Sequence, residues 1–490
     1  MVNILGANSV SGGYEIENSL RFNDGDSSKL TFTPGGAGDR DTFTFSFWIK
    51  RTTLGAAQRI FSAGTSIGTN NNNVSSLLFE SNDTLKFFGE VGGSASFTLQ
   101  TDRLFRDPSA WYHIVVAVDT EDGTAANRIK LYVNGVQESS FSTATYMSQN
   151  TDTFFNAANL HNISYAGGGG FVDGYLAEFH HIDGTQLAAS DFGETDDNGV
   201  WIPKKYTGTY GTNGVYLEFK QTGTGTNASG MGADTSGNTH HYAPVNLAAT
   251  DVTTDTPTNN FATLNPLHTE GTTFAEGNTD VLMSRSGAWN VAMGTMAIPN
   301  SGKWYMEIKI TAINASAHNV IGFLDAEYPF MGSNDTATGF TGGGTSWLSL
   351  VYFHAANDNA YVNSADGSAY QFENNTTFNG SVNDIYSMAF DRDNNKVWFG
   401  LNGVYAKANG TTGANPSTGA DATITDVSSS VTYIPQGASG SSSARQQWNF
   451  GNAPHAISSG NADANGYGNF EYAVPSGYYS LCTKNLAEFG

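Results

Sequence analysis

Apolar and polar residues alternate with a period of two along several stretches of the chain. Between residues 42 and 50, four apolar side chains share one face: Phe43, Phe45, Phe47 and Ile49. Residues 111–119 and 303–310 repeat this alternation. Because successive side chains of a β-strand point to opposite faces, each stretch is predicted to be a strand with one side over a hydrophobic core.

Tight turns follow two further alternating stretches. Residues 128–133 lead into Asn134-Gly135, and residues 396–401 lead into Asn402-Gly403. Asn-Gly supplies the two positive-φ residues of a two-residue hairpin turn. No long stretch keeps a helical period, and the best candidate for a short helix is 187–190. The predicted fold class is therefore all-β, with two β-sandwich domains of the jelly-roll type joined by an extended polar connector.

A polar stretch rich in Gly, Thr and Asn separates the two blocks of predicted strands. Such a composition indicates a long loop or an extended crossing rather than a packed domain. The predicted organisation is an N-terminal docking arm at 1–18, a first sandwich at 19–220, the connector at 221–270 and a second sandwich at 271–490.

Composition and charge exclude several classes of protein. Aromatic residues make up 12% and charged residues 14% of the chain, which is the reverse of a disordered composition. The net charge of −23 argues against a nucleic-acid partner. The single cysteine, Cys482, excludes an internal disulfide. The start has no basic segment before an apolar one, and the apolar run at 114–118 is far shorter than the ~20 residues of a membrane helix, so neither a signal peptide nor membrane insertion is expected.

Three segments of the first block resemble a known family. Residues 19–50 are similar to the opening strands of laminin G-like, concanavalin A-like jelly rolls. Residues 111–136 resemble the central hairpin of that family, and residues 173–194 resemble its closing strand and short helix. The resemblance implies the same jelly roll here.

The rest of the chain resembles virion proteins of tailed phages. Residues 199–219 and 254–267 are similar to the region after the jelly roll in those tail fibre-like proteins. In them a domain resembling the SPRY sandwich follows, and its pattern is matched in order at 301–310, 320–326, 397–405, 449–451 and 474–486. The resemblance therefore implies a SPRY-like second sandwich.

The resemblance also implies a function. It suggests a structural virion protein, a tail fibre or tail-associated appendage that recognises glycan or protein on the host surface. Its partners would be other virion proteins and the host receptor. It would be a homo-oligomer, with a trimer as one form, made in the host cytoplasm and located in the tail or outer surface of the virion. A capsid-surface decoration protein and a polysaccharide-degrading enzyme are the alternatives.

No residue is predicted to be catalytic. Residues 64–68 match the G-x-S-x-G nucleophile elbow, but the Asn-rich sequence that follows cannot begin the helix which that elbow needs. The carboxylate pairs Glu15/Glu17 and Asp24/Asp26 lie in the arm and in a turn. They lack the spacing along a strand that glucanases of this fold carry, so no enzyme activity is expected.

No cofactor is expected, and calcium is the one candidate left open. The adjacent histidine pairs 180–181 and 240–241 would point to opposite faces of a strand and could not chelate one metal ion. The acidic loop with Asp119, Glu121 and Asp122 could supply oxygen ligands for calcium, which laminin G-like domains sometimes bind at one rim. A solvated acidic turn is the alternative interpretation of this loop.

Exposed aromatic rings are the candidates for ligand binding, because sugar sites combine rings with polar groups. Tyr206, Tyr210, Tyr352 and Tyr361 are the candidates, each beside polar residues. Trp347 is instead expected in the core, since it shares a strand face with apolar residues.

Overall fold

The computed structural model describes residues 13–490 except 66, 68–71, 166, 168–169, 328–346, 354–359, 364–370 and 376, and describes only the backbone of residues 268–270, 353, 361, 363 and 371–374. The described residues divide into two compact units, 13–258 and 259–490. Each unit is a β-sandwich, which confirms the predicted fold class. Within these described residues, no helix is long and apolar enough to cross a membrane.

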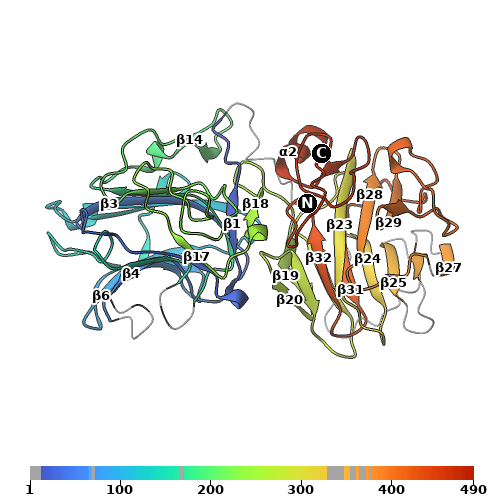
Figure 1. Cartoon of the computed structure of the whole chain (residues 1–490), viewed down its shortest axis with the longest axis horizontal. Helices are drawn as coiled ribbons and strands as arrows, with labels where there is room; N and C mark the ends of the chain where they lie inside the picture. The colour runs from blue at the N-terminus through green and yellow to red at the C-terminus, as the bar shows by residue number, and fades with distance from the viewer. Residues whose placement is uncertain are drawn as a thin grey trace. The chain divides into compact units, whose positions relative to one another are not determined.

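The first sandwich has two main sheets, which Figure 1 shows as separate layers containing β3 and β4. The β3 sheet runs in the order β10 (Val136–Gln137), β9 (Ile129–Val133), β8 (Trp111–Asp119), β3 (Thr42–Arg51), β13 (Gly174–Asp183), β1 (Ser19–Phe22) and β18 (Val252–Thr253), with β16 (Val215–Leu217) also on β13. The β4 sheet runs in the order β11 (Phe141–Thr145), β7 (Ser94–Leu104), β6 (Thr84–Val91), β5 (Val74–Phe79), β4 (Gln58–Gly64), β12 (Leu160–Ile163), β2 (Lys29–Phe32) and β17 (Ala243–Val245). A small pair, β14 (Gly193–Thr195) and β15 (Trp201–Pro203), and short 3-10 turns at Asp24–Asp26, Ala125–Asn127, Ala189–Asp191 and Ala249–Asp251 complete the unit.

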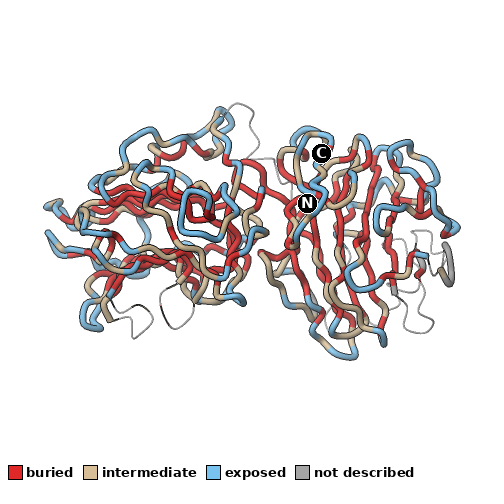
Figure 2. The backbone as a smooth tube through the Cα atoms, in the orientation of Figure 1, coloured by how far each residue is buried: buried red, intermediate tan, exposed pale blue. Residues whose placement is uncertain are grey.

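Alternation along β3 builds the core of the first sandwich. Its four predicted apolar residues are fully buried or nearly so and belong to one hydrophobic cluster: Phe43, Phe45, Phe47 and Ile49. Phe61 of the β4 sheet meets the Phe45 ring edge-on at 4.9 Å, so side chains of the two layers interdigitate. Figure 2 shows the buried backbone concentrated in these layers. The Asn134-Gly135 turn has φ values of 47° and 81°, as the hairpin prediction requires.

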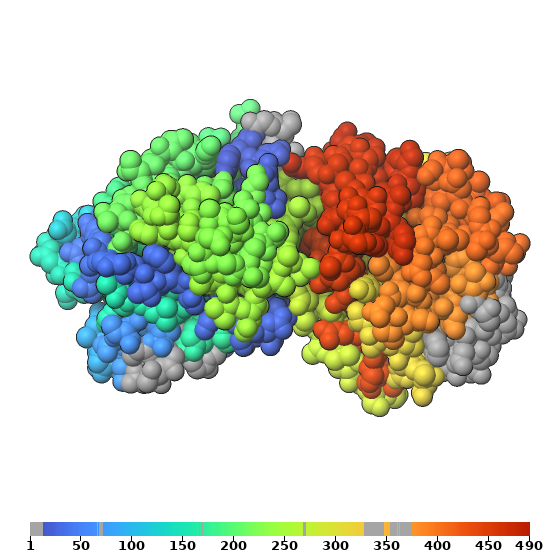
Figure 3. Space-filling view, in the orientation of Figure 1, coloured from blue at the N-terminus to red at the C-terminus, as the bar shows by residue number. Residues whose placement is uncertain are grey.

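The other face of β3 is also buried, although its side chains are polar apart from Trp48. Thr44, Ser46 and Lys50 are at most 1% exposed. Chain from the C-terminal part of the unit lies over them: the Thr44 hydroxyl donates to the carbonyl of Thr185, and Lys50 contacts Asp255. Figure 3 shows the stretch that precedes residue 258, in green, on the surface of this unit.

The predicted connector is divided between the two units. Its residues up to 258 add β17 and β18 to the first sandwich, and β19 of the second sandwich begins at Leu264. Its residues up to 258 therefore form an extended covering layer on the first sandwich. Residues 1–12 of the predicted docking arm lie outside the described residues. Ile16 in the same arm is buried, and its N–H donates to Thr258 Oγ1 at 3.1 Å.

The second sandwich is likewise two-layered. The β31 sheet runs in the order β19 (Leu264–Glu270), β22 (Asn290–Gly294), β31 (Tyr433–Ser439), β24 (Asn319–Asp325), β25 (Trp347–Phe353), β26 (Ala360–Asn363) and β27 (Gln371–Asn375). The β23 sheet runs in the order β20 (Thr272–Ala275), β21 (Asp280–Met283), β32 (Arg445–Asn449), β23 (Lys303–Ala312), β28 (Ile385–Asp391), β29 (Lys396–Leu401) and β30 (Val404–Tyr405), with β33 (Tyr479–Ser480) parallel to β23. A 3-10 turn at Pro416–Thr418 and the helix α2 (Thr483–Phe489) complete it.

Between these layers lie the residues that the alternation of 303–310 predicts for a core. All four are fully buried in one cluster: Trp304, Met306, Ile308 and Ile310. The second Asn-Gly turn is also confirmed, with φ values of 50° at Asn402 and 82° at Gly403. Trp347 is buried as expected, but in a separate cluster on the other face of the β31 sheet.

Candidate functional site

Three loops meet at the end of the first sandwich where β3 begins. Strands β3 and β8 are antiparallel, with Thr42 opposite Asp119, so the residues before β3 lie beside the loop after β8. The Thr120 N–H donates to the carbonyl of Asp41 at 2.9 Å. Sheet register therefore places the predicted acidic loop against Asp41.

The third loop is held to the other two by backbone and side-chain hydrogen bonds. The Asn150 N–H donates to the carbonyl of Thr120 at 2.9 Å. The Arg40 guanidinium pairs with Asp152 at 2.5 Å. These contacts fix a cluster of carboxylates that we call the acidic rim: Asp39, Asp41, Asp119, Glu121 and Asp152.

Asp41 is the most perturbed carboxyl group of the acidic rim. Burial, a hydrogen bond shared with Asp152, and the charges of Asp152, Asp39 and Glu121 raise the pKa of Asp41 to about 6. Asp41 Oδ1 and the hydroxyl of fully buried Thr120 have no hydrogen-bond partner. Buried polar atoms normally have partners, so these two oxygens are where a cation or an ordered water would complete the hydrogen bonding.

Of the three calcium candidates from the sequence, Asp119 and Glu121 belong to the acidic rim, and Asp122 follows them in the same loop. Asp119 Oδ1 accepts the N–H of Glu121 at 3.0 Å, and Asp122 Oδ1 accepts the N–H of Thr124 at 2.7 Å. Those oxygens therefore close the turn, and the unmet oxygens belong to residues that the sequence analysis missed. The signal for Asp41 was its position directly before a strand that pairs with β8.

Some oxygens of the acidic rim are of the kind that calcium binds. Calcium takes six to eight oxygen ligands, which include carboxylates, hydroxyls, carbonyls and water. Asp41, Asp152 and the Thr120 hydroxyl could contribute, although Arg40 already occupies one oxygen of Asp152. Among the described residues, no group of three or more His, Cys, Asp or Glu is arranged to hold a metal ion.

The predicted ligand-binding residues Tyr206 and Tyr210 use their hydroxyls within the fold. The Tyr210 hydroxyl lies 2.9 Å from His180 Nδ1, and the Tyr206 hydroxyl donates to the carbonyl of Thr209 at 2.9 Å. The Tyr206 ring also stacks on Phe192 at 5.0 Å. Both tyrosines are therefore part of a packed aromatic cover on the β3 sheet.

The candidate Tyr352 needs correction, because its side chain is fully buried in the core of the second sandwich. Strand alternation turns Leu348, Leu350 and Tyr352 inward and Trp347 outward. The Tyr352 hydroxyl accepts a hydrogen bond from Gln446 Nε2 at 3.2 Å and is not presented to a ligand. The side chain of Tyr361 lies outside the described residues.

Two features could suggest hydrolytic chemistry, and the first is the Ser46–His113 pair. The Trp201 indole N–H can only donate, and it does so to His113 Nδ1 at 3.0 Å. The proton of neutral His113 is therefore on Nε2, which donates to Ser46 Oγ at 2.9 Å. Burial lowers the pKa of His113 to about 3. Since its Nε2 already carries a proton, this histidine cannot activate Ser46 as a nucleophile.

The second feature is Glu178, which sits at a bulge in β13 with a positive φ of 50°. Its carboxylate accepts the hydroxyls of Tyr216 at 2.7 Å and Tyr14 at 3.2 Å, and lies 3.4 Å from His180 Nε2. Burial, and then the charge of Glu178, raises the pKa of Tyr216. With its oxygens satisfied, Glu178 holds Tyr14 and Tyr216 to the sheet rather than presenting a free acid or base.

The G-x-S-x-G motif does not form a nucleophile elbow in the described residues. Gly64 ends β4, and the next described element is β5, which pairs antiparallel with β4. The motif therefore opens a strand-to-strand connection, as the sequence analysis expected. Ser66 itself lies outside the described residues.

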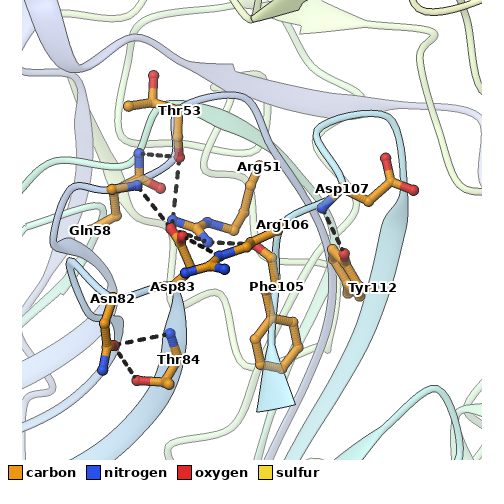
Figure 4. A network of polar contacts seen from close by, with 11 residues as sticks. Arg51, Thr53, Gln58, Asn82, Asp83, Thr84, Phe105, Arg106, Asp107 and Tyr112 are labelled. Carbon is orange, nitrogen blue, oxygen red and sulfur yellow. Dashed lines mark hydrogen bonds and ion pairs between the residues drawn. The ribbon is translucent and has the colours of Figure 1, made fainter. Parts of the chain in front are cut away.

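A charged network closes the opposite end of β3, and Figure 4 shows Arg51 and Arg106 converging on Asp83. Asp83 also accepts the N–H of Gly55 at 2.8 Å, and Arg51 donates to the carbonyl of Phe105 at 2.6 Å. Burial opposes ionisation of Asp83, but the Gly55 N–H and the two guanidinium groups outweigh it and lower its pKa. The charges of this network are paired with one another and join strand ends, although Arg51 Nε has no partner, so we assign it a structural role.

Comparison with known proteins agrees with this geometry. A family model described as the concanavalin A-like lectin/glucanases superfamily matches residues 24–190. A search of curated proteins found no matching sequence.

Several solved structures are similar. The SPRY domain of human HERC1 is 13% identical, with 38% of this chain and 96% of that chain covered and a TM-score of 0.28. The heptameric SAP-like pentraxin of Limulus polyphemus is 21% identical, with 36% and 80% covered and a TM-score of 0.26. Domains LG4-5 of the mouse laminin alpha1 chain are 8% identical, with 89% and 90% covered and a TM-score of 0.29. The family match and the described sheets agree on an all-β chain in which residues 24–190 are similar to the concanavalin A-like lectin/glucanases superfamily.

Proposed function

We propose that this chain is a structural virion protein of a tailed phage, in a tail fibre or tail-associated appendage. In this proposal it binds glycan or protein of the host surface and catalyses no reaction. The lectin-like fold of residues 24–190 supports a binding role. The sequence resemblance to tail fibre-like proteins supports the placement in a virion, with other virion proteins as partners.

The acidic rim is the proposed binding surface. The observation that carries this choice is that Asp41 Oδ1 and the Thr120 hydroxyl both lack partners, in two residues joined by a backbone hydrogen bond. Asp41 and Asp152 would hold a calcium ion, which supplies open coordination positions for hydroxyl or carboxylate groups of a ligand. Arg40 orients Asp152 through their ion pair, and the surrounding loops provide specificity.

Two observations support a protein without enzymatic activity. The tautomer of His113 is the wrong one for activating Ser46. The carboxylate of Glu178 is already bound by two tyrosine hydroxyls and lies beside His180. These are the two arrangements discussed above that most resemble catalytic machinery.

Glycan-array binding with calcium and with a chelator tests the proposed surface. We expect binding that needs calcium and that is lost in Asp41→Asn and Asp152→Asn. Asp24→Asn is the matched control, because Asp24 lies in an exposed turn away from the acidic rim. Binding that is unchanged in both rim variants would reject the acidic rim as the binding surface.

Mass spectrometry of purified phage particles tests the virion assignment separately. We expect peptides of this chain in intact particles at a fixed copy number. Absence from the particles would reject the virion role while leaving the calcium-dependent binding result intact.

A further inference from the structure

A lysine and an aspartate are sealed together beneath the covering layer of the first sandwich. Lys50 lies in β3 on the face away from the core, and Asp255 follows β18. The two residues are 205 positions apart, yet Lys50 Nζ contacts Asp255 Oδ2. Both side chains have no exposed surface. Two opposite charges are therefore held in contact without solvent, where the loss of hydration strongly disfavours ions.

Aromatic rings and hydrogen bonds hold Lys50 and Asp255 in place. Lys50 Nζ lies 4.8 Å from the centre of the Tyr175 ring and 5.8 Å from that of Trp111. The Trp111 indole N–H donates to Asp255 Oδ1 at 3.3 Å. The Asp255 carbonyl accepts the hydroxyl of Ser19 at 2.6 Å, which fixes the backbone behind the carboxyl group. Such fixed proximity is the condition under which a slow bimolecular reaction becomes a fast intramolecular one.

The buried environment favours the neutral form of the Lys50 amine. Burial lowers the pKa of Lys50, although the charges of Asp255 and Asp107 oppose this effect. Transfer of one proton along the contact converts the ammonium and carboxylate into an amine and a carboxylic acid. An amine is the nucleophilic form of lysine, and a protonated carboxyl group is the electrophilic form of aspartate.

We propose that Lys50 and Asp255 condense into an intramolecular amide bond. The lone pair of Nζ attacks Cγ of the protonated carboxyl group, and the negative charge develops on Oδ1. The Trp111 N–H stabilises that charge, as a hydrogen-bond donor does in an oxyanion hole. The Nζ–Cγ bond forms and the Cγ–Oδ2 bond breaks. The departing hydroxyl takes a proton from the nitrogen, and one water molecule leaves, so the reaction needs no oxidant or cofactor.

The amide would replace a buried ion pair by a neutral covalent link. It joins the central strand β3 to the end of the covering layer and closes a ring of the chain between the two residues. Pulling or unfolding could then not separate the covering layer from the jelly roll. This inference does not depend on the calcium site or on the virion assignment.

The mass of the full-length chain, measured after denaturation, tests the bond. We expect the wild-type protein to be lighter than its sequence by one water molecule. Lys50→Arg keeps a positive charge, but the guanidinium stays protonated and should not form the amide, so this variant should have its full sequence mass. Asp255→Asn should lose one ammonia instead. The matched control is Asp251→Asn, which removes the neighbouring Arg21–Asp251 pair and should still lose one water.

Peptide mapping locates the bond after digestion. The peptides that contain Lys50 and Asp255 should appear as one branched species in the wild type and as two separate peptides in Lys50→Arg. The inference is overturned if the wild-type chain has its full sequence mass. It is equally overturned if the loss of water persists in Lys50→Arg or maps to another residue. Because the wild-type mass alone decides the question, a poorly folding variant does not obscure it.

Discussion

Acid should unfold the first sandwich because buried histidines must stay neutral there. Burial lowers the pKa of His113 to about 3 and that of His161 to about 4, and it lowers the pKa of His181 well below 6.5. In the unfolded chain each histidine titrates near ~6.5. Below that pH the unfolded chain binds more protons than the folded one, so the free energy of unfolding falls as the pH falls.

The size of the effect follows from these shifts. At pH 5 each histidine favours the unfolded state by about 2 kcal/mol, since one pH unit corresponds to about 1.4 kcal/mol. The three together therefore remove about 6 kcal/mol between pH 7 and pH 5, against a typical total of about 5–15 kcal/mol. Asp41 acts in the opposite direction, because its raised pKa means that protonation near pH 6 stabilises the fold. Asp41 is a single, partly exposed group, so it offsets only part of the loss.

His181→Phe isolates one of the three contributions. The His181 ring already contacts Phe45 at 4.7 Å and Phe61 at 6.1 Å, and its Nε2 has no hydrogen-bond partner. A phenylalanine should therefore be accepted at pH 7. It should remove about one third of the loss of stability on acidification, because one of three titrating groups is gone.

Urea unfolding at pH 7, 6 and 5, followed by brief deuterium labelling at one fixed pH, measures this effect. Peptides of β3 and β8 report the first sandwich by mass. The midpoint urea concentration should fall steeply between pH 6 and pH 5, and less steeply in His181→Phe. Unchanged midpoints across this range, or a wild-type pH dependence in His181→Phe, would refute the reasoning.

Three further substitutions test the rim, the charged network and a turn. Asp41→Asn should stabilise the calcium-free protein at pH 7.5 by about 1 kcal/mol, because it removes carboxylate repulsion that solvent partly screens. It should also abolish the rise in Tm on adding calcium. Calorimetry with calcium and with a chelator measures both effects, and a retained calcium response would contradict the site. Asp83→Asn should destabilise the first sandwich by about 3–5 kcal/mol, because Arg51 stays buried without its counter-charge. Urea unfolding measures this loss, and an unchanged free energy of unfolding would disprove the prediction. Gly135→Ala should lower stability by about 1–3 kcal/mol, since φ is 81° and a Cβ would meet the Trp201 ring; a Tm equal to that of wild type would show that the turn relaxes without penalty.

Alternation along a strand predicted the parts of the fold whose structure depends only on residues close in the sequence. The inward row of β3 and the two Asn-Gly turns follow from local chemistry. Tyr352 was misplaced because both faces of β25 are buried, and a period of two cannot say which face meets the core.

The acidic rim and the Lys50–Asp255 pair could not be predicted for a different reason. Asp41 acquires its perturbed carboxyl group only when β3 and β8 pair and the loop with Asp152 returns beside them. Local alternation places Lys50 on the polar face of an amphipathic strand, and the chain that buries it lies some 200 positions later in the sequence. Contacts between segments far apart in the sequence leave no pattern in the residues around either segment.

The last two strands of the first sandwich, β17 and β18, also prevent self-association through the sheet edges. Strand β17 borders β2 at one end of the β4 sheet, and β18 borders β1 at one end of the β3 sheet. A fragment cut at residue 220 would lose both strands and bare the hydrogen-bonding groups of β1 and β2, which are ready to pair with another chain. The matched family segment ends at residue 190, but the shortest piece of this chain that stays monodisperse should extend to residue 258.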